Sequence, residues 1–293
     1  TMTPRRCCIL AAAAAALALS STAALAQDRT GWPTSIKVGT ASQGGTFFIY
    51  GAGWANLVQE KTGVNASSEV TGGPVQNLAL VQNRQVDFAM TTMGPAYEAW
   101  TGNSPIAPGV EMRNIRATFP MYQTPFEIIA LKSKGIASIK DLAGKKVGVG
   151  PRGGTPGTYW PLFFKELGVN VSVQYGGAAD LGTQLQDGLI DAFAFAAGLP
   201  IPNFAEIEAQ QPANIFAFTP EEQAKIAGAF PSVSPYTIQG GIYRGTPEPR
   251  ASVAMWNFGI VHKDLPESFV YEVMKAVLDN NDRMKQIHPA AAE

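Results

Sequence analysis

The chain has 293 residues, with 22 Lys and Arg side chains against 23 Asp and Glu, two His and two Cys. This near-neutral balance offers no basic face for nucleic acid, and the length suffices for two lobes of ordinary domain size. Both cysteines, Cys7 and Cys8, lie in the first 26 residues, so the remainder of the chain can have neither thiol catalysis nor thiolate metal sites.

Residues 1–26 have the layout of a cleavable secretory signal peptide. Arg5 and Arg6 form a short basic start, an Ala- and Leu-rich run follows, and Ala24-Leu25-Ala26 is a small-residue cleavage signature. The apolar run is short for a membrane span, which makes an uncleaved anchor helix the less favoured alternative. Removal of Arg5 and Arg6 leaves 20 basic against 23 acidic side chains, a net charge near −3. We therefore predict a periplasmic protein without a later membrane helix.

Five short motifs recur in the same order, which indicates an internal duplication. Residues 36–92 contain Lys37-Val38-Gly39, Gly44-Gly45-Thr46, Gly63-Val64-Asn65, Gly72-Gly73 and Val86-Asp87; residues 145–197 contain Lys146-Val147-Gly148, Gly153-Gly154-Thr155, Gly168-Val169-Asn170, Gly176-Gly177 and Ile190-Asp191. Each unit is predicted to run strand, Gly-rich turn, helix, strand, Gly-Gly turn, helix, strand. Such alternation is typical of parallel, right-handed βαβ units, so the two units predict two similar α/β lobes with parallel-rich sheets flanked by helices.

The predicted elements follow in chain order. The first unit has strands at 36–40, 66–70 and 86–91 and helices at 46–61 and 74–83; the second has strands at 146–150, 171–175 and 191–196 and helices at 157–167 and 180–187. Strand-like segments at 114–121 and 126–131, with Thr124-Pro125 between them, predict a crossing into the second lobe. A short helix is expected at 138–144, and a capping box at Thr219 predicts a helix start.

The C-terminal part is predicted to return to the first lobe. The Pro- and Gly-rich stretch 231–249 is either the return crossing or a surface loop, 252–261 is a strand, and an apolar stripe from Phe269 to Leu278 predicts a helix. The expected division is therefore signal peptide 1–26, first lobe 27–124, second lobe 125–245, and return with C-terminal helix 246–293.

The duplicated Gly-Gly turns are the candidate ligand site. Ligands of open parallel sheets lie at the carboxyl ends of the strands, where the first amides of a helix lack internal partners and favour an anion. One wall of a shared cleft would comprise Ser42, Gln43, Gly44, Gly45 and Thr46, the other Arg152, Gly153, Gly154, Thr155 and Thr158, with Thr71-Gly72-Gly73 and Tyr175-Gly176-Gly177 beside them. The alternative is that these glycines only make tight turns.

Two further residue types near the turns are candidates for ligand contact. Arg152 is the formal cation of these loops, and it either holds a carboxylate through paired hydrogen bonds or is a solvated loop residue. Phe47 and Tyr159 lie nearest the turns and are predicted to form an apolar floor, whereas the neighbouring aromatic residues are assigned to the core.

Other motifs predict no chemistry. Asp87 and Asp191 start their strands, away from the crevice, and are interpreted as structural. The segment from Gly148 to Gly153 matches the dinucleotide fingerprint, but no acidic residue follows the next strand to hold a ribose. The two histidines, His262 and His288, have no metal-ligand spacing, and no nucleophile with an oriented base is recognisable. We therefore expect no metal, no cofactor and no enzyme activity.

Several of these segments together resemble the TAXI solute receptors of TRAP transporters. The likeness extends from about residue 36 to 284 and includes the crossing segment Tyr122-Gln123-Thr124-Pro125-Phe126. It is most specific at 39–50, 71–77, 86–99, 136–154 and 195–202. It implies a type II periplasmic-binding-protein clamshell, membrane subunits that use an ion gradient, and small carboxylates such as glutamate-like or dicarboxylate ligands. It also implies ligand contacts at 42–47, 71–73, 153–158, and at Ala197 and Gly198.

The predicted function is a monomeric extracytoplasmic receptor. It would capture a small organic anion or amino-acid-like ligand bearing a carboxylate and deliver it to the membrane subunits of a TRAP transporter. An alternative is a periplasmic sensor that presents the bound solute to a membrane kinase or chemoreceptor, and a third is a periplasmic enzyme on the same scaffold.

Overall fold

The structure is a computed structural model that describes residues 29–293. The predicted signal peptide, with Cys7 and Cys8, lies outside the described residues. Residues 33–293 form one compact unit, to which the description below refers. Among the described residues, no helix combines the length and apolar character needed to cross a membrane.

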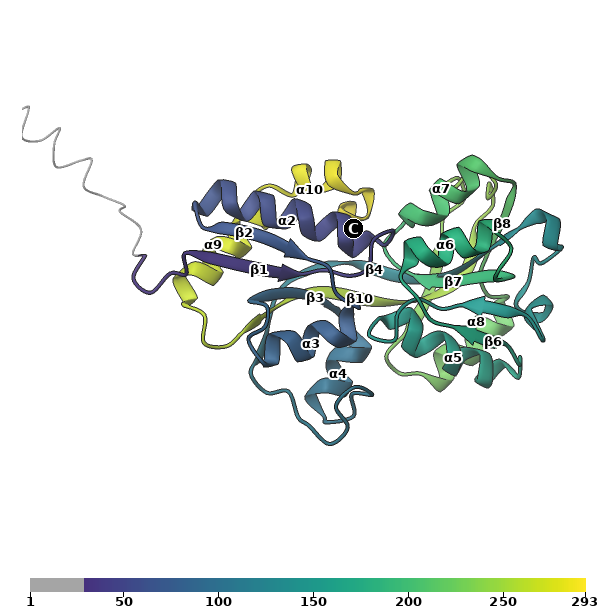
Figure 1. Ribbon diagram of the computed structural model, residues 1–293, viewed down its shortest axis with the longest axis horizontal. Coiled ribbons are helices and arrows are strands. Elements are labelled where there is room, and N and C mark those ends of the chain that lie inside the picture. Colours follow the sequence, from purple (N-terminus) through teal and green to yellow (C-terminus); the bar gives the residue numbers. More distant parts are fainter. Residues whose placement is uncertain (1–28) are drawn as a thin grey trace, which may run out of the picture. The chain divides into compact units, whose positions relative to one another are not determined.

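Ten strands of this unit form a mixed sheet flanked by helices (Figure 1). The strands are β1 (Ser35–Gly39), β2 (Asn65–Glu69), β3 (Phe88–Thr92), β4 (Ile115–Leu131), β5 (Lys146–Gly148), β6 (Ser172–Gln174), β7 (Ala192–Ala196), β8 (Ala213–Phe216), β9 (Ser234–Ile238) and β10 (Arg250–His262). The helices are α2 (Thr46–Thr62), α3 (Pro74–Gln82), α4 (Met93–Trp100), α5 (Thr155–Leu167), α6 (Ala178–Gln186), α7 (Pro202–Gln210), α8 (Pro220–Ala229), α9 (Glu267–Leu278) and α10 (Asn281–Ile287). Short 3₁₀ turns cover Lys132–Lys134, Ile139–Leu142 and Pro289–Ala292.

The long strands β4 and β10 join two lobes. The strand order is β2-β1-β3-β10-β4-β7-β5-β6, with β8 on β4 and β9 on β10. Lobe 1 comprises β1–β3 with α2–α4, α9 and α10, and lobe 2 comprises β5–β9 with α5–α8. Figure 1 shows both long strands passing from one lobe into the other. The predicted boundary at 124/125 falls inside β4, and the one at 245/246 falls just before β10; these exact limits stay a prediction.

The two lobes repeat the same strand register, which supports the duplication. β1 pairs in parallel with β3 through Val38 and Phe88, and β5 pairs in parallel with β7 through Val147 and Ala192, the positions that the sequence motifs align. The two aspartates of the repeat are also equivalent: the Asp87 carboxylate accepts from the Lys37 amide at 2.8 Å, and Asp191 accepts from the Lys146 amide at 2.9 Å. Each aspartate therefore ties the beginning of the third strand of its lobe to the first strand.

Several elements differ from the sequence prediction. The return crossing is β10 itself, because the stretch 231–249 stays in lobe 2 and its strand β9 pairs antiparallel with β10. The two segments predicted around Thr124-Pro125 are one continuous strand, β4. Helices α4 and α7 and strand β8 were not predicted, since their short sequences carry no clear apolar period. The capping box at Thr219 is present and begins α8.

Each lobe has an aromatic core. In lobe 1 the Trp54 ring contacts Phe88 and Phe119 edge-on, and Phe88 contacts Phe269 of α9. In lobe 2 the Trp160 ring stacks on Phe164 and Phe218. Edge-on and offset ring pairs are favourable beyond their buried area, so these cores hold each lobe rigid around the sheet.

Candidate functional site

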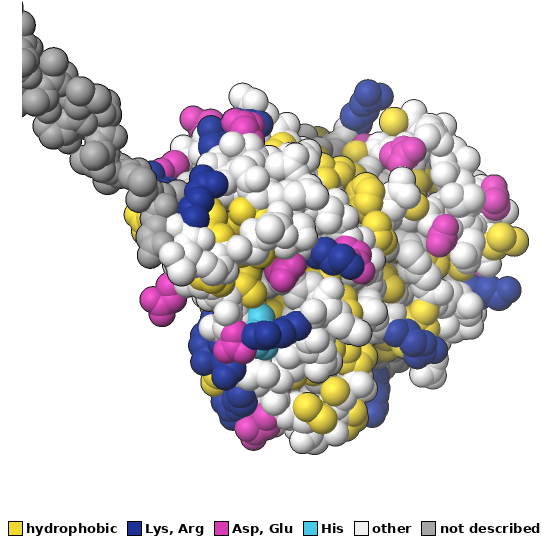
Figure 2. All heavy atoms as spheres, turned by 60° about the vertical axis from the view of Figure 1, so that its left-hand side comes forward, with side chains coloured by type: hydrophobic (Ala, Val, Ile, Leu, Met, Phe, Trp, Pro, Cys, Tyr) yellow, Lys and Arg dark blue, Asp and Glu magenta, His cyan; other side chains and the backbone are white. Residues whose placement is uncertain are grey.

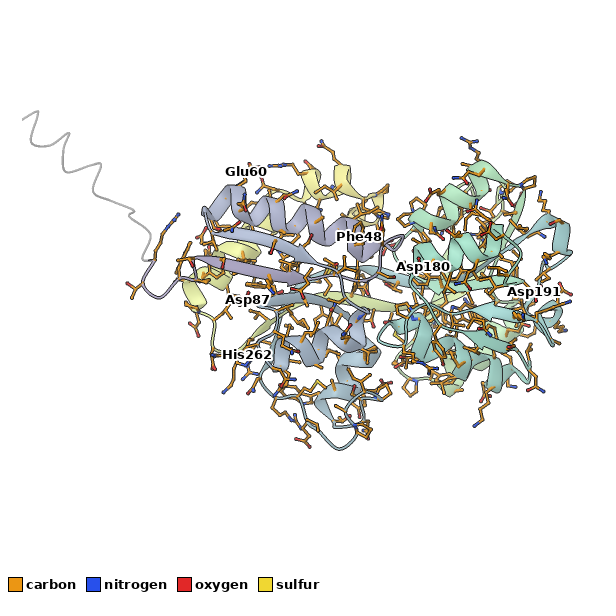
Figure 3. All side chains as sticks on the ribbon, viewed as in Figure 1. Phe48, Glu60, Asp87, Asp180, Asp191 and His262 are labelled. Atoms are coloured by element: carbon orange, nitrogen blue, oxygen red, sulfur yellow. The ribbon has the colours of Figure 1, made fainter. Side chains whose placement is uncertain are left out.

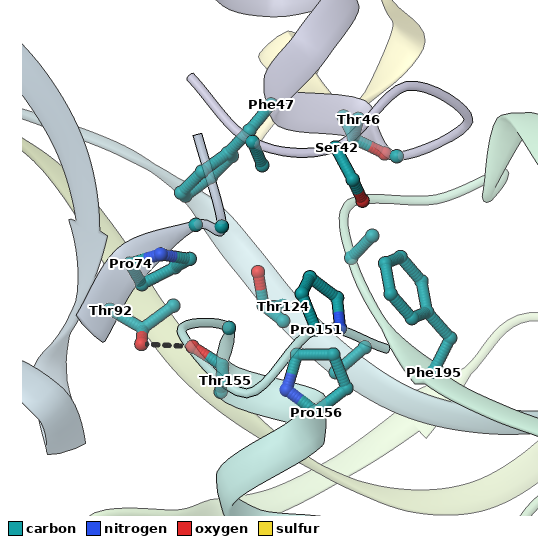
Figure 4. Close-up of a pocket in the computed structure, with 17 residues that line it drawn as sticks. Ser42, Thr46, Phe47, Pro74, Thr92, Thr124, Pro151, Thr155, Pro156 and Phe195 are labelled. Carbon is teal, nitrogen blue, oxygen red and sulfur yellow. Dashed lines mark hydrogen bonds between the residues drawn. The ribbon is translucent and has the colours of Figure 1, made fainter. Parts of the chain in front are cut away.

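A pocket lies between the two lobes, where the Gly-rich turns of both units meet. It encloses about 400 Å³ outside the protein atoms, open mouth included. Its lining comprises Ala41, Ser42, Gly45, Thr46, Phe47, Gly72, Gly73, Pro74, Thr92 and Thr124 from lobe 1 and β4, and Pro151, Gly154, Thr155, Pro156, Phe195, Ala196 and Ala197 from lobe 2. Figure 4 shows the Phe47 and Phe195 rings on opposite sides of this space.

About half of the predicted site residues line this pocket. They are Ser42, Gly45, Thr46, Phe47, Gly72, Gly73, Gly154, Thr155 and Ala197. The pocket therefore brings together both copies of the Gly-Gly-Thr turn, one second turn and the segment after β7. Whether these residues contact a ligand is a proposal that the next subsection develops.

Predicted residues of the first turn that lie outside the lining join the lobes instead. The Gln43 carbonyl accepts from the Ala179 amide in the first turn of α6 at 3.0 Å, and the Gly44 carbonyl accepts from the Asn203 amide of α7 at 3.1 Å. The hydroxyl oxygen of Ser42 accepts from the Ala178 amide at 3.1 Å. The first turn of lobe 1 thus caps two helices of lobe 2.

The equivalent turn of lobe 2 does the same for lobe 1. The Gly153 carbonyl accepts from the Val75 and Gln76 amides, at 2.9 and 3.1 Å, in the first turn of α3. Helices α3 and α6 follow the second Gly-Gly turn of each unit, and both were expected to offer free amides. Carbonyl groups of the opposite lobe satisfy their amides instead, so the second turns contribute closure contacts rather than an anion site.

Threonine hydroxyls make a second pair of contacts between the lobes. Thr46 donates to the Gly198 carbonyl at 2.6 Å, and the Thr92 and Thr155 hydroxyls share a hydrogen bond of 2.6 Å (Figure 4). Thr46 and Thr155 occupy the same position in the two repeats. Each threonine of the Gly-Gly-Thr motif therefore contacts the segment at or just after the third strand of the opposite lobe. The predicted contact residue Gly198 acts here through its carbonyl.

The remaining predicted residues are engaged within or between the lobes. Arg152 is exposed, and its guanidinium lies 3.8 Å from the Tyr175 ring centroid, which is a cation–π contact. The Gly176 amide donates to the Gly150 carbonyl, and the Thr158 hydroxyl donates to Gly154 in its own helix. Thr71 buries its hydroxyl against the Thr40 carbonyl and Asn77. None of these residues belongs to the pocket lining.

Tyr159 is a contact between the lobes rather than part of the pocket floor. Its hydroxyl donates to Glu98 Oε1 of α4 at 2.6 Å. Burial raises the pKa of the Glu98 carboxyl, and the Tyr159 hydrogen bond opposes that rise. Burial, followed by the Glu98 charge, raises the pKa of Tyr159 well above its usual range. Tyr159 is therefore a neutral donor that holds α5 to α4.

The pocket is electrostatically simple. Its lining residues, all within the described part of the chain, carry no charged side chain. Thr46 and Phe47 occupy the first two positions of α2, and their backbone amides have no hydrogen-bond partner among residues 29–293. These amides and the dipole of a 17-residue helix give one wall a partial positive charge. On the face shown in Figure 2, acidic and basic side chains are interspersed over the surface.

Sequence reasoning missed eight lining residues. Thr92 ends β3, and Phe195 and Ala196 end β7, so the rule that ligands lie at the carboxyl ends of strands already pointed to them. Thr124 lies on the crossing strand β4, where its hydroxyl and Asn257 exchange hydrogen bonds. The other missed residues are Ala41, Pro74, Pro151 and Pro156, which flank the glycines of the turns.

Other titratable residues lie away from the pocket. Figure 3 shows Asp87 and Asp191 in different lobes, where each binds a backbone amide of its own sheet. His288 Nε2 lies 3.1 Å from the Pro200 carbonyl, and His262 Nδ1 lies near Arg84. In residues 29–293 no group of three or more His, Asp or Glu side chains is placed to hold a metal ion.

Comparison with known proteins places this arrangement in a family. The sequence profile of the NMT1-like family matches residues 38–293. The chain belongs to that family. Both Gly-Gly-Thr turns and all the pocket-lining residues of this NMT1-like protein fall inside the matched range.

Solved structures with the same fold are type II solute-binding proteins. An ancestral arginine-binding protein bound to arginine is 15% identical, with 88% of this chain and 97% of that chain covered and a TM-score of 0.56. The substrate-binding protein of an amino acid ABC transporter is 16% identical, with 86% of this chain and 96% of that chain covered and a TM-score of 0.54. The alkanesulfonate-binding protein from Xanthomonas axonopodis pv. citri is 12% identical, with 89% of this chain and 84% of that chain covered and a TM-score of 0.53. These likenesses establish the two-lobed periplasmic-binding-protein fold of the NMT1-like chain.

Proposed function

We propose that this NMT1-like protein is an extracytoplasmic solute receptor that encloses a small carboxylate-bearing ligand between its lobes. The observation that carries the proposal is the pocket formed by both copies of the Gly-Gly-Thr turn. A carboxylate there would accept hydrogen bonds from the Thr46 and Phe47 amides at the N-terminus of α2, which have no hydrogen-bond partner within residues 29–293. Closure of the lobes around it would exclude water and strengthen those bonds.

The site supports binding rather than turnover. The threonine hydroxyls of Thr46 and Thr124 are bonded to protein acceptors, and Thr92 bonds Thr155. A nucleophile would need a base within hydrogen-bond reach, and no lining residue in the described chain is a His, Asp, Glu or Lys. The residues of the pocket are therefore suited to enclose a ligand without changing it.

The resemblance to TAXI receptors supports delivery to a TRAP transporter of the inner membrane. The distinguishing test is uptake into proteoliposomes that contain the receptor with candidate membrane subunits. We expect uptake of the bound carboxylate to require an ion gradient and to proceed without ATP. Uptake that depends on ATP would assign the receptor to another transporter class while leaving the ligand-binding proposal intact.

The binding proposal is tested by a glycine substitution between the lobes. A side chain at Gly154 would place its Cβ 3.2 Å from the Gly72 carbonyl of lobe 1, and the backbone there (φ −106°) accepts any residue. Gly154→Leu is therefore expected to fold but to prevent full closure. Gly228→Leu is the matched control, because a Cβ at Gly228 in α8 meets no atom within 4 Å.

The measurement is the thermal shift caused by small carboxylates. A ligand at about 100 times its Kd adds about 2.7 kcal/mol to the stability of the protein that binds it. We expect this shift in the wild type and in Gly228→Leu, and its loss in Gly154→Leu. An equal shift in all three proteins would exclude the pocket between the lobes as the binding site.

A further inference from the structure

We infer that the ligand of this pocket is a small monocarboxylate without an ammonium group, so that the receptor discriminates against free α-amino acids. The inference rests on the proposed function and specifies its ligand class. It is based on which charges the pocket can neutralise, and on how much room it has.

A bound amino acid would need a carboxylate for its ammonium group, and no lining residue of the described chain supplies one. Glu98 lies outside the lining, where its Oε1 accepts from Tyr159 and its Oε2 is buried without a hydrogen-bond partner in residues 29–293. Glu127, on β4 and also outside the lining, is fully buried and pairs with Arg250 and Tyr243. An ammonium group enclosed in the pocket would therefore lose its water without gaining a counter-charge, which is strongly unfavourable.

Asp180, in the first turn of α6, is the remaining acidic group near the mouth. It is exposed and does not belong to the lining. Figure 3 shows it on α6, on the lobe 2 side. A solvated carboxylate outside the enclosed space contributes little attraction to a buried ammonium group because water screens it.

A second carboxylate on the ligand would be less well matched than the first. Arg152 is the cation of the turns, and it is exposed with its guanidinium over the Tyr175 ring. The α2 amides of Thr46 and Phe47 and the Ser42 hydroxyl proton have no hydrogen-bond partner among the described residues, and they suit one carboxylate group on the lobe 1 wall. On the lobe 2 wall the Thr155 amide is also free within this part of the chain, but the next helix position is Pro156, which has no N–H.

The opposite side of the pocket is apolar. Phe195, Pro151 and Pro156 of lobe 2 lie across the space from Phe47 and Pro74, which are together on the lobe 1 side (Figure 4). The space outside the protein atoms is about 400 Å³ with the open mouth included, so the group beyond the carboxylate must be small. A short aliphatic or aromatic group attached to the carboxylate fits this wall.

Matched sets of compounds test the inference on the wild-type protein by calorimetry. Each set contains an acid, its 2-amino derivative and its amide: butanoate with 2-aminobutanoate and butanamide, 4-methylpentanoate with leucine and 4-methylpentanamide, and 3-phenylpropanoate with phenylalanine and 3-phenylpropanamide. We expect at least one acid to bind and its amino derivative to bind at least about 100-fold more weakly. The amide is also expected to be weaker, since it carries no negative charge for the helix terminus.

A charge added to the pocket should weaken the preference for the acid. The Thr124 hydroxyl lies in the lining and already accepts from Asn257 Nδ2 at 2.7 Å, so an aspartate there keeps an acceptor for that amide. Thr124→Asp should improve the affinity for the amino derivative relative to the acid by at least about 10-fold. Thr124→Asn changes the side chain to the same size without the charge, and it should not produce this relative gain even if it alters both affinities.

The outcomes separate this inference from the receptor proposal. An amino acid that binds the wild type as tightly as its parent acid would overturn the inference and leave the receptor proposal standing. An amide that binds as tightly as the acid would overturn the carboxylate site itself. Absence of binding by every acid up to about 10 mM would also overturn the inference, and the receptor proposal would then rest on the Gly154→Leu comparison.

Discussion

The hydrogen bond from Thr46 to Gly198 gives the sharpest test of how the lobes stay closed. Thr46 is fully buried, and its hydroxyl donates across the interface at 2.6 Å to a carbonyl of lobe 2. Thr46→Val keeps the shape of the side chain but removes the donor. The Gly198 carbonyl is then enclosed without a partner in the closed state, whereas water can reach it in the open state.

The size of the expected change in Kd follows from this difference between the closed and open states. A buried acceptor left without a partner costs about 1–3 kcal/mol, which converts to a change of about 5- to 150-fold in the equilibrium between closed and open states. Because ligand binding requires closure, the Kd of a carboxylate should rise by a factor within this range. Small-angle scattering of the free protein should show a larger radius of gyration wherever the open state becomes populated.

The control is a second buried threonine that bonds a carbonyl inside one lobe. The Thr62 hydroxyl donates to the Val58 carbonyl at 2.7 Å at the end of α2, far along the helix from the pocket. Thr62→Val should lower the free energy of unfolding but leave the Kd and the scattering profile unchanged. If Thr46→Val likewise alters neither the Kd nor the radius of gyration, the bond does not contribute to closure and the reasoning is refuted.

Three further predictions concern the stability of the fold and the titration of buried groups. Thr219→Ala removes the hydroxyl that accepts from the Glu222 amide at the start of α8 and should lower the free energy of unfolding by about 1 kcal/mol in urea titrations. Tyr159→Phe leaves the buried Glu98 carboxylate without its donor, so the pKa of Glu98, already raised by burial, should rise further in an NMR titration; an unchanged pKa would argue against the bond. Burial lowers the pKa of His288, so the neutral imidazole stabilises the fold fully above its unfolded pKa of about 6.5, and this contribution is lost as the pH falls from there through the lowered pKa. The difference in melting temperature between wild type and His288→Gln should therefore shrink on acidification; a constant difference would contradict the assignment.

The duplication made most of the fold predictable. Lys37-Val38-Gly39 and Lys146-Val147-Gly148 locate the first strand of each lobe, and the structure pairs both with their third strands in the same register. Gly-Gly-Thr before each first helix also located the pocket, because parallel strands direct their carboxyl ends to one edge. Because each motif occurs in both units, the same strand or turn is predicted from two separate segments, and agreement between the two segments strengthens the prediction.

The contacts between the lobes could not be predicted in the same way. Gln43, Gly44 and Gly153 act through carbonyl oxygens, which every residue type possesses, so no sequence pattern marks them. The role of Arg152 was equally hard to predict. Its guanidinium lies over the Tyr175 ring, which competes with any ligand for that group, and only the fold brings Arg152 and Tyr175 together. Tyr159 follows its turn by one helical turn, which directs it at α4 rather than into the pocket.

The pseudo-symmetry of the lobes divides the helix N-termini between two tasks. Helices α3 and α6 use their first amides on carbonyl groups of the opposite lobe, so closing either side of the pocket supports the other. The helices that begin at Gly-Gly-Thr are left for a ligand, but they are not equivalent. In α5 the second position is Pro156, which has no N–H, whereas in α2 it is Phe47, which has one. An anion should therefore bind closer to lobe 1, and lobe 2 should close over its apolar end.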